Sequence, residues 1–365
     1  MLIFYGFLIF CVLLLIYMYL ENFNLQVTNY TISSKRVPNA FDGARFVMLA
    51  DLHSNSFGRD NERLINKINE ANPQFIVIAG DLIVGKEHCD YSVALSLMEK
   101  LSKQYPIYYG FGNHEQRIME GGDHCDENFN SYIDKLKNMG VHLINNETCT
   151  IYRKEEGKVK EKGNKEKEDK GKDRKDKGKD RKDKGKDRKD KEKDRKDKEK
   201  EENAKEKKEG IDRKEGIDRK EKEKAAGNDK EKEDRIKITS VEIGKEYFQK
   251  FKKSNMETEY LQNLVGIPDN KCYNILIAHN PIYFKTYINW GVDLVLSGHL
   301  HGGIARLPWL GGVISPQYEL FPKYDAGEFH ENGQTMLVSR GLGTHTIKLR
   351  AFNRPELMVV TLKRP

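Results

Sequence analysis

The stretch Gln74-Phe75-Ile76-Val77-Ile78-Ala79-Gly80-Asp81 contains the pattern on which the fold depends. Its apolar, β-branched run predicts a buried strand, and the glycine allows a tight backbone turn directly after it. The turn exposes the carboxylate of Asp81. Four other short polar motifs occur along the chain, most of them directly after apolar runs: Asp51-Leu52-His53, Gly112-Asn113-His114-Glu115, Ala278-His279-Asn280-Pro281 and Gly298-His299-Leu300-His301-Gly302-Gly303. Carboxylate and imidazole groups at strand ends are typical ligands of first-row transition metals.

Predicted strands and helices alternate around these motifs. Apolar runs predict buried strands over residues 45–50, 74–79, 107–111, 274–278 and 292–296. Helices are predicted over residues 60–71, 91–102, 128–139 and 281–289. Asp60 is the expected N-cap of the first helix. This alternation predicts a layered α/β domain whose ligands gather at the carboxyl ends of the strands.

Residues 2–20 carry no charge and are almost wholly apolar. About 20 such residues are enough to cross a bilayer as a helix, so we expect an uncleaved, single-pass membrane anchor. A cleaved signal peptide is the alternative, but the segment lacks a basic start and a small-x-small cleavage site. The nearby basic residues Lys35 and Arg36 follow the span. The positive-inside rule would place the domain in the cytoplasm, but two residues so far from the span leave its side open.

Residues 153–235 consist mainly of Lys, Arg, Asp and Glu, and include four copies of a seven-residue unit beginning at Gly171, Gly178, Gly185 and Glu192. A heptad without apolar positions cannot form a coiled-coil seam, so we expect a solvated insertion that is disordered or transiently helical. It holds 37 Lys and Arg against 29 Asp and Glu, which leaves 27 against 28 in the rest of the chain. The mixed signs weaken attraction to anionic lipid or nucleic acid, and we expect no nucleic-acid partner.

The remaining segments, residues 37–152 and 236–365, are long enough for one sizeable core. Within them, the spacing of Asp51 and His53 in an extended segment directs both side chains to the same side. Asp81 has two carboxylate oxygens and can bridge two cations. Amide oxygen from Asn113 and imidazole nitrogens together favour manganese, iron or zinc over calcium. The five cysteines show no metal-type spacing, and they leave the cellular compartment open.

The series D-x-H, G-D, G-N-H-E, H and G-H-x-H, in this order, resembles the calcineurin-like metallophosphoesterases. The resemblance implies a four-layer α/β fold, a β-sandwich flanked by helices. It also implies two metal ions. The first would be held by Asp51, His53, Asp81 and His301, and the second by Asp81, Asn113, His279 and His299.

The same resemblance assigns catalytic roles to His114 and Glu115. His114 would give a proton to the leaving oxygen or stabilise the transition state, and Glu115 would orient its imidazole. Many relatives carry Asp at the position of Glu115. Metal-bound hydroxide would then hydrolyse a phosphodiester, pyrophosphate or phosphomonoester bond.

Three C-terminal stretches look like the membrane-associated bacterial branch of this family: residues 307–312, 339–343 and 350–357. That branch includes phosphodiesterases and relatives of UDP-diacylglucosamine pyrophosphatases, which suggests a lipid-linked or nucleotide-containing substrate at the membrane. Arg340 and Arg350 could hold a phosphate or form surface ion pairs. The residues after Asp81 lack the arginine that Ser/Thr protein phosphatases place there. We expect a monomeric enzyme. A catalytically silent membrane-tethered scaffold is the alternative.

Overall fold

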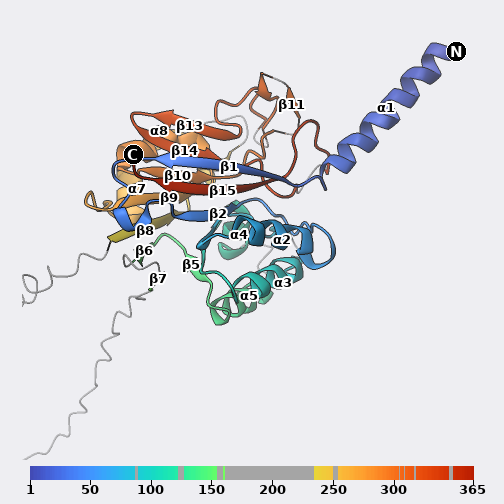
Figure 1. The fold of residues 1–365 in the computed structure, drawn as a ribbon. Coiled ribbons are helices and arrows are strands. Elements are labelled where there is room, and N and C mark those ends of the chain that lie inside the picture. Colours follow the sequence, from blue (N-terminus) through green and yellow to red (C-terminus); the bar gives the residue numbers. More distant parts are fainter. Residues whose placement is uncertain are drawn as a thin grey trace, which may run out of the picture. The chain divides into compact units, whose positions relative to one another are not determined.

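The computed structural model describes residues 1–86, 89–121, 127–153, 159–160, 234–249, 254–303, 305–307, 309–315, 318–344 and 348–365 (Figure 1). The charged insertion predicted over residues 153–235 lies almost entirely outside these ranges. Its two edges lie within strands, because Arg153 ends β6 and Asp234 begins β8.

The first sheet has six strands in the order β1-β15-β2-β3-β4-β5. They are β1 (Gln26–Ser33), β2 (Arg45–Leu49), β3 (Phe75–Ala79), β4 (Ile107–Gly110), β5 (His142–Ile144) and β15 (Glu356–Lys363). The central strands β2 to β5 run parallel, and β15 pairs antiparallel with β2. Parallel strands bring their carboxyl ends to one edge of the sheet, where loops can place side chains together.

The second sheet has seven strands in the order β13-β14-β10-β9-β8-β6-β7. They are β6 (Thr148–Arg153), β7 (Val159–Lys160), β8 (Asp234–Val241), β9 (Tyr273–Ala278), β10 (Leu294–Ser297), β13 (Gly327–Glu331) and β14 (Gln334–Val338). Here β8, β9, β10 and β14 run parallel. This sheet therefore also gathers strand ends at one edge.

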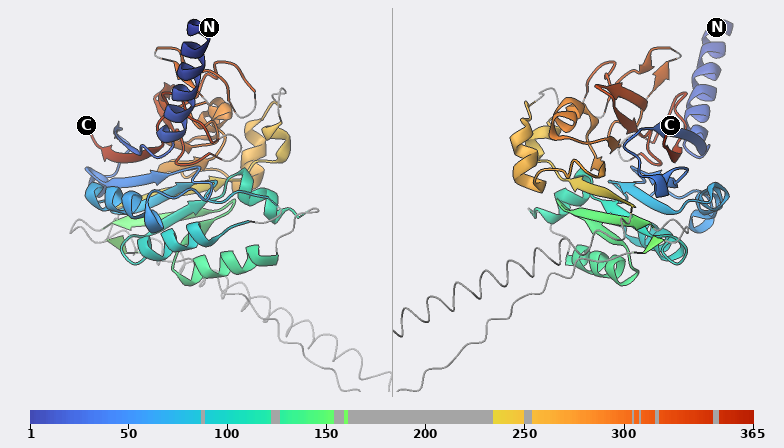
Figure 2. Two further views of the ribbon diagram at one scale, coloured as in Figure 1. Left: turned by 90° about the vertical axis from the view of Figure 1, so that its right-hand side faces the viewer. Right: turned by 60° about the vertical axis from the view of Figure 1, so that its left-hand side comes forward.

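The two sheets pack face to face, and helices cover their outer faces (Figure 2). Helices α2 (Glu62–Ala71), α3 (Ser92–Leu101), α4 (Asn113–Met119) and α5 (Glu127–Asn138) cover the first sheet, and α7 (Thr258–Val265) and α8 (Phe284–Trp290) cover the second. One apolar core lies between the sheets, and one lies under each helical layer. The predicted four-layer α/β architecture is confirmed.

Some local expectations were wrong. The helix predicted from residue 60 begins at Glu62, and Asp60 lies before it in the 3-10 helix η2 (Arg59–Asn61) with a left-handed backbone. Asn61 is the N-cap instead, and its Oδ1 accepts a hydrogen bond from the backbone N–H of Phe57. Strand β1 was not predicted. It precedes residue 37 and gains its order from parallel pairing with β15 at the other end of the chain.

Helix α1 (Leu2–Glu21) precedes the sheets. Among the described residues, Ile3–Glu21 is the candidate span long and apolar enough to cross a membrane, and the protein buries none of it. A signal sequence meets the same criteria of length and composition.

Candidate metal centre

The structure brings all seven predicted ligands to the carboxyl ends of the strands. Asp51 and Asp81 follow β2 and β3, and Asn113 opens α4 directly after β4. The histidines of the second sheet follow β9 and β10. Six of these side chains, together with that of His114, form three groups whose ligand atoms lie close enough to share a metal ion. The first group is Asp51, His53 and His301, the second is Asp81, His279 and His299, and the third, which includes His114, is His53, Asp81 and His114.

The backbone at these strand ends is strained. Left-handed φ angles between 49° and 68° occur at Asp51, His53, Asp81, His299 and His301. Such conformations cost non-glycine residues about 1–3 kcal/mol each and persist where the surrounding structure enforces them. Gly80 has a φ of 87°, and a Cβ there would lie 2.6 Å from Nδ1 of His279. Only glycine therefore fits this turn between β3 and Asp81.

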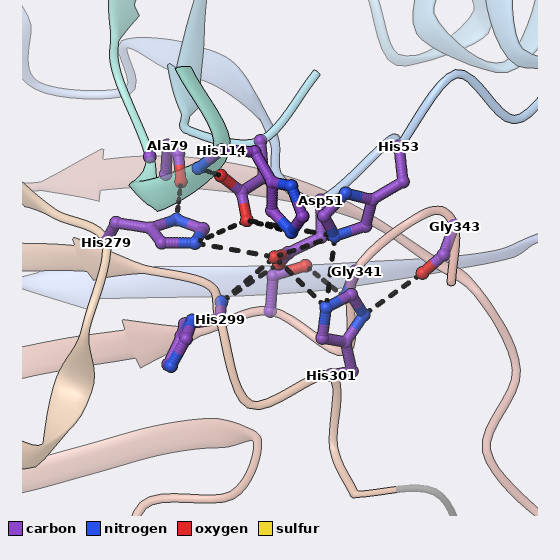
Figure 3. A network of polar contacts seen from close by, with 12 residues as sticks. Asp51, His53, Ala79, His114, His279, His299, His301, Gly341 and Gly343 are labelled. Atoms are coloured by element: carbon purple, nitrogen blue, oxygen red, sulfur yellow. Dashed lines mark hydrogen bonds and ion pairs between the residues drawn. The ribbon is translucent and has the colours of Figure 1, made fainter. Parts of the chain in front are cut away.

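The first group of ligands has the spacing of atoms that share one cation. Nε2 of His53 lies 3.2 Å from Nε2 of His301, which lies 3.4 Å from Oδ1 of Asp51. Donors bound to one metal at about 2.0–2.2 Å stand roughly 3–3.5 Å apart. Figure 3 shows these imidazoles turned toward Asp51.

The second group corresponds to the second metal site predicted from the sequence, which also includes Asn113. Oδ1 of Asn113 is buried and accepts no hydrogen bond from the described residues. A buried amide oxygen without a partner is costly, and a cation would satisfy it. Oδ2 of Asp81 lies 3.0 Å from Nε2 of His279 in the same group, and 3.8 Å from Nε2 of His53 in the first. Asp81 therefore stands between both groups, as a bridging carboxylate must.

Backbone carbonyls select the tautomer of three ligand histidines. Nδ1 of His279 lies 2.7 Å from the carbonyl oxygen of Ala79, and Nδ1 of His301 lies 3.0 Å from that of Gly343. Nδ1 of His53 faces the carbonyl of Ile83 at 3.4 Å. A carbonyl can only accept, so in the neutral ring each Nδ1 carries the hydrogen and each Nε2 presents a lone pair. The close Nε2 atoms of His53 and His301 would thus repel unless a cation or a proton lies between them.

His114 is held in the opposite tautomer. Its Nδ1 accepts a hydrogen bond from the backbone N–H of Gly85 at 2.9 Å, so the hydrogen of the neutral ring is on Nε2. That nitrogen lies 4.0 Å from Oδ2 of Asp81. The backbone N–H of His114 also donates to Oδ1 of Asp81. His114 therefore points a donor, not a lone pair, toward the ligand groups.

The hydrogen bonds of Glu115 connect it to the loops around the site. Its carboxylate accepts hydrogen bonds from the backbone N–H groups of Asp81 and Gly112, both at 2.9 Å, and from the hydroxyl of Tyr109 at 2.7 Å. The reason is its position at the start of α4, where the side chain turns back toward the loop after β3. Glu115 fixes the loops that carry Asp81 and Asn113 relative to each other.

Arg350 has neither of the roles predicted for it. The side chain is fully buried, and it donates hydrogen bonds to the carbonyl oxygens of Arg340, Gly341, Gly343 and Asn353. Gly343 in turn accepts from His301, so Arg350 supports a metal-facing imidazole through the backbone. Burial lowers the pKa of Arg350 to about 10. The Gly341–Gly343 turn supports the site through contacts between residues far apart in the sequence.

The charges in the centre are arranged to hold a cation. Burial raises the pKa of Asp51 to about 7, against the opposing charge of His279. Burial also raises the pKa of Asp81, but the charges of His279 and the neighbouring histidines outweigh it and hold that pKa well below its ordinary value. Burial lowers the pKa of His279, yet Asp81 raises it to about 10. The site favours positive charge between these ligand atoms.

Comparison of the sequence with family models agrees with the geometry of the site. A family model for calcineurin-like phosphoesterases matches residues 44–303, which include all seven ligand positions as well as His114. The chain belongs to the calcineurin-like phosphoesterase family. The predicted resemblance is confirmed, and with the buried His and Asp groups it makes the protein a metal-dependent phosphoester hydrolase.

Three relatives place the chain within this family. It is 23% identical to the uncharacterized metallophosphoesterase YkuE of Bacillus subtilis, over 94% of this chain and 88% of that protein. It is 27% identical to a transmembrane protein with a metallophosphoesterase domain from Danio rerio, over 36% of this chain and 28% of that protein. It is also 27% identical to the UDP-2,3-diacylglucosamine pyrophosphatase LpxG of Chlamydia muridarum, over 34% of this chain and 36% of that protein.

Proposed function

We propose that this calcineurin-like phosphoesterase is a membrane-anchored enzyme with two metal ions, and that it hydrolyses a lipid-linked or nucleotide-containing phosphoester. The observation that carries the first metal site is the approach of Nε2 of His53 to Nε2 of His301 at 3.2 Å, with Nδ1 of each ring turned to a backbone carbonyl. Asp81 connects this group to the second group. The orphan oxygen of Asn113 supports a second cation there.

The residues of each group define the two sites. Asp51, His53, Asp81 and His301 would hold the first metal, and Asp81, Asn113, His279 and His299 the second. The nitrogen and oxygen donors suit manganese, iron or zinc. Such metals, when bound, neutralise charge on a phosphoryl group and lower the pKa of water.

His114 supplies the proton in this proposal. Gly85 holds its Nδ1 as an acceptor, so Nε2–H is available to the oxygen that leaves phosphorus. The ring is buried beside Asp81 and cannot turn without losing the hydrogen bond from Gly85. Gly85 therefore positions the imidazole, and Glu115 stabilises the loops around it.

Two observations support the proposed membrane anchoring and the proposed class of substrate. Helix α1 is long enough to span a bilayer, and none of its apolar window is buried in the protein. The similarity to LpxG, whose name describes cleavage of a nucleotide-linked acylated sugar, favours a substrate with a lipid part. A phosphodiester or pyrophosphate at a membrane surface satisfies both observations.

The proposal is tested on the purified full-length protein with Asp81→Ala. Metal content and turnover of an aryl phosphodiester are measured on the same samples. We expect the variant to lose most bound metal and at least about 10³-fold in turnover, because the bridging carboxylate serves both sites. Asp134→Ala, at an exposed position on α5, is the matched control. Wild-type protein that binds metal but turns over no phosphoester would favour the scaffold alternative instead.

A further inference from the structure

Large apolar side chains are exposed on the segment between β10 and β13 and at Phe352, which precedes β15. They lie around a small two-stranded sheet, β11 (Arg306–Leu307) and β12 (Gly311–Gly312), and the segment after it. Trp309 is fully exposed, at 102% relative accessibility. We call this the aromatic patch; its members are Leu307, Trp309, Leu310, Leu320, Phe321 and Phe352. Soluble proteins rarely expose so many large apolar side chains together without a binding partner.

The aromatic patch is continuous with the end of helix α1. The backbone N–H of Arg306 in β11 donates to the carbonyl of Ala351, which directly precedes Phe352. The ring of Phe352 lies 5.6 Å from that of Tyr17 on α1. The backbone N–H of Arg350 donates to the carbonyl of Met18. Figures 1 and 2 show β11 and β12 on the same side of the sheets as α1.

We propose that the aromatic patch docks on the surface of the lipid bilayer that α1 enters. This inference depends on the membrane anchoring proposed above. Trp, Phe and Leu are suited to the boundary between headgroups and acyl chains, where an amphipathic surface lies flat on the membrane. Lys348 is an exposed cation beside the base of α1, which favours anionic headgroups there.

The backbone of the patch indicates that folding does not require these side chains. Trp309, Phe321 and Phe352 have left-handed φ angles of 66°, 50° and 52°. A bulky residue is disfavoured in this region of φ/ψ space, whereas glycine adopts it readily. Because the rings of Trp309 and Phe321 are exposed, packing in the core does not offset this strain at these two residues. A membrane would supply the missing contact.

Docking would set the position of the metal centre relative to the bilayer. The chain passes from His301 to β11 within five residues. Asn353, next to Phe352, donates from Nδ2 to the carbonyl oxygens of His301 and Gly303. The docked segment is therefore joined by direct hydrogen bonds to a metal-facing loop. The phosphoester of an amphiphile at the bilayer surface is then the group within reach of the site.

Trp309 provides a direct test, because the chain has two tryptophans. The other, Trp290, is buried in α8 and donates to the carbonyl of Gly266. Full-length Trp290→Phe protein is reconstituted in vesicles of phosphatidylcholine and phosphatidylglycerol that carry bromine in the upper acyl chain. We expect quenching of Trp309 by about half and protection from aqueous iodide, as for a ring at the interface. Unquenched, iodide-accessible Trp309 in protein that floats with the vesicles would overturn the inference, and so would failure to float.

A second experiment measures the consequence for turnover. Trp309→Gly and Phe321→Gly are combined in the full-length protein, and hexadecyl 4-nitrophenyl phosphate in the same vesicles is the probe. Turnover of this amphiphile should fall about fivefold or more, while that of bis(4-nitrophenyl) phosphate in detergent micelles stays within about twofold. Ile267→Ser changes an exposed apolar residue outside the patch and is the matched control. Equal vesicle turnover in variant and wild type contradicts docking. Failure of the hydrolase proposal itself appears as absent turnover in the wild type in micelles.

Discussion

The loops after β2, β9 and β10 and the N-terminus of α4 use histidine in opposite ways. In the loops, a backbone carbonyl takes the Nδ1 hydrogen of His53, His279 or His301, and Nε2 is left as a ligand. At the start of α4, a backbone N–H donates to Nδ1 of His114, and Nε2 keeps its hydrogen. One backbone hydrogen bond thus distinguishes an imidazole that can bind metal from one that can donate a proton.

The largest expected effect comes from removing a loop histidine whose Nε2 is a ligand. His279→Ala should lose metal and reduce turnover at least about 10³-fold, because charge stabilisation of several kcal/mol is lost with the ion. Metal analysis and steady-state kinetics on one preparation measure both. His330→Ala, at a position that is largely exposed, is the control. Full metal content in His279→Ala would remove His279 from the ligand set.

His114→Ala should separate the two kinds of histidine. We expect unchanged metal content and a 10²- to 10⁴-fold loss of kcat, since general acid catalysis contributes about that factor. An aryl substrate whose leaving group needs no proton should lose less than an alkyl substrate. Loss of metal equal to that of His279→Ala would show that the tautomer does not divide the roles.

Glu115→Gln tests whether the Glu115 carboxylate stabilises the loops that carry Asp81 and Asn113. Its carboxylate accepts hydrogen bonds from two backbone N–H groups through one oxygen, and an amide NH₂ placed there would face those donors. We expect the free energy of unfolding to fall by about 1–3 kcal/mol and metal affinity to fall about 10- to 100-fold. Thermal unfolding and metal titration measure these changes.

Glu120→Gln, exposed at the end of the same helix, is the matched control for that experiment. If Glu115→Gln changes kcat alone, with stability and metal affinity intact, Glu115 acts on His114 after all.

The smallest effect concerns Glu242, a buried carboxyl that follows β8 and has no place in the metal groups. Burial, with the charges of Glu115 and Glu120, raises its pKa to about 8. The folded state therefore keeps this proton at pH values where the unfolded chain has lost it. The contribution of Glu242 to the free energy of unfolding is present at acid pH and is lost as the pH rises toward 8. Between pH 5 and pH 8, the free energy of unfolding of Glu242→Gln should therefore rise relative to that of the wild type by about 1–3 kcal/mol.

Melting temperatures of wild type and Glu242→Gln across this pH range measure that difference. Glu259→Gln, exposed on α7, controls for general loss of charge. Parallel pH profiles for Glu242→Gln and wild type would show that Glu242 ionises normally in the fold.

Local patterns predicted the parts of this protein that depend on neighbouring residues. Apolar runs identified β2, β3, β4, β9 and β10, and their polar ends supplied every residue of the ligand groups. The pairing of β1 with β15 was beyond such reasoning, because it joins residues more than 300 positions apart. The same holds for Arg350, whose partners are carbonyls of a turn formed elsewhere in the sequence.

The tautomers were also hidden from the sequence. His114 and His279 each follow a strand, and nothing in their local motifs states which ring nitrogen meets a carbonyl and which meets an N–H. The contacts of Glu115 were hidden for the same reason: it is adjacent to His114 in the chain, but its carboxylate accepts a hydrogen bond from the backbone of another loop. Roles within a site depend on hydrogen bonds that only the assembled fold defines.

Anomalous diffraction from a crystal of the manganese-loaded protein tests the central claim most directly. The account predicts two peaks on either side of Oδ2 of Asp81, one within about 2.0–2.3 Å of Nε2 of His301 and one at the same range from Nε2 of His279. Nε2 of His114 should touch neither ion. A single peak, or an ion bound to His114, would contradict it.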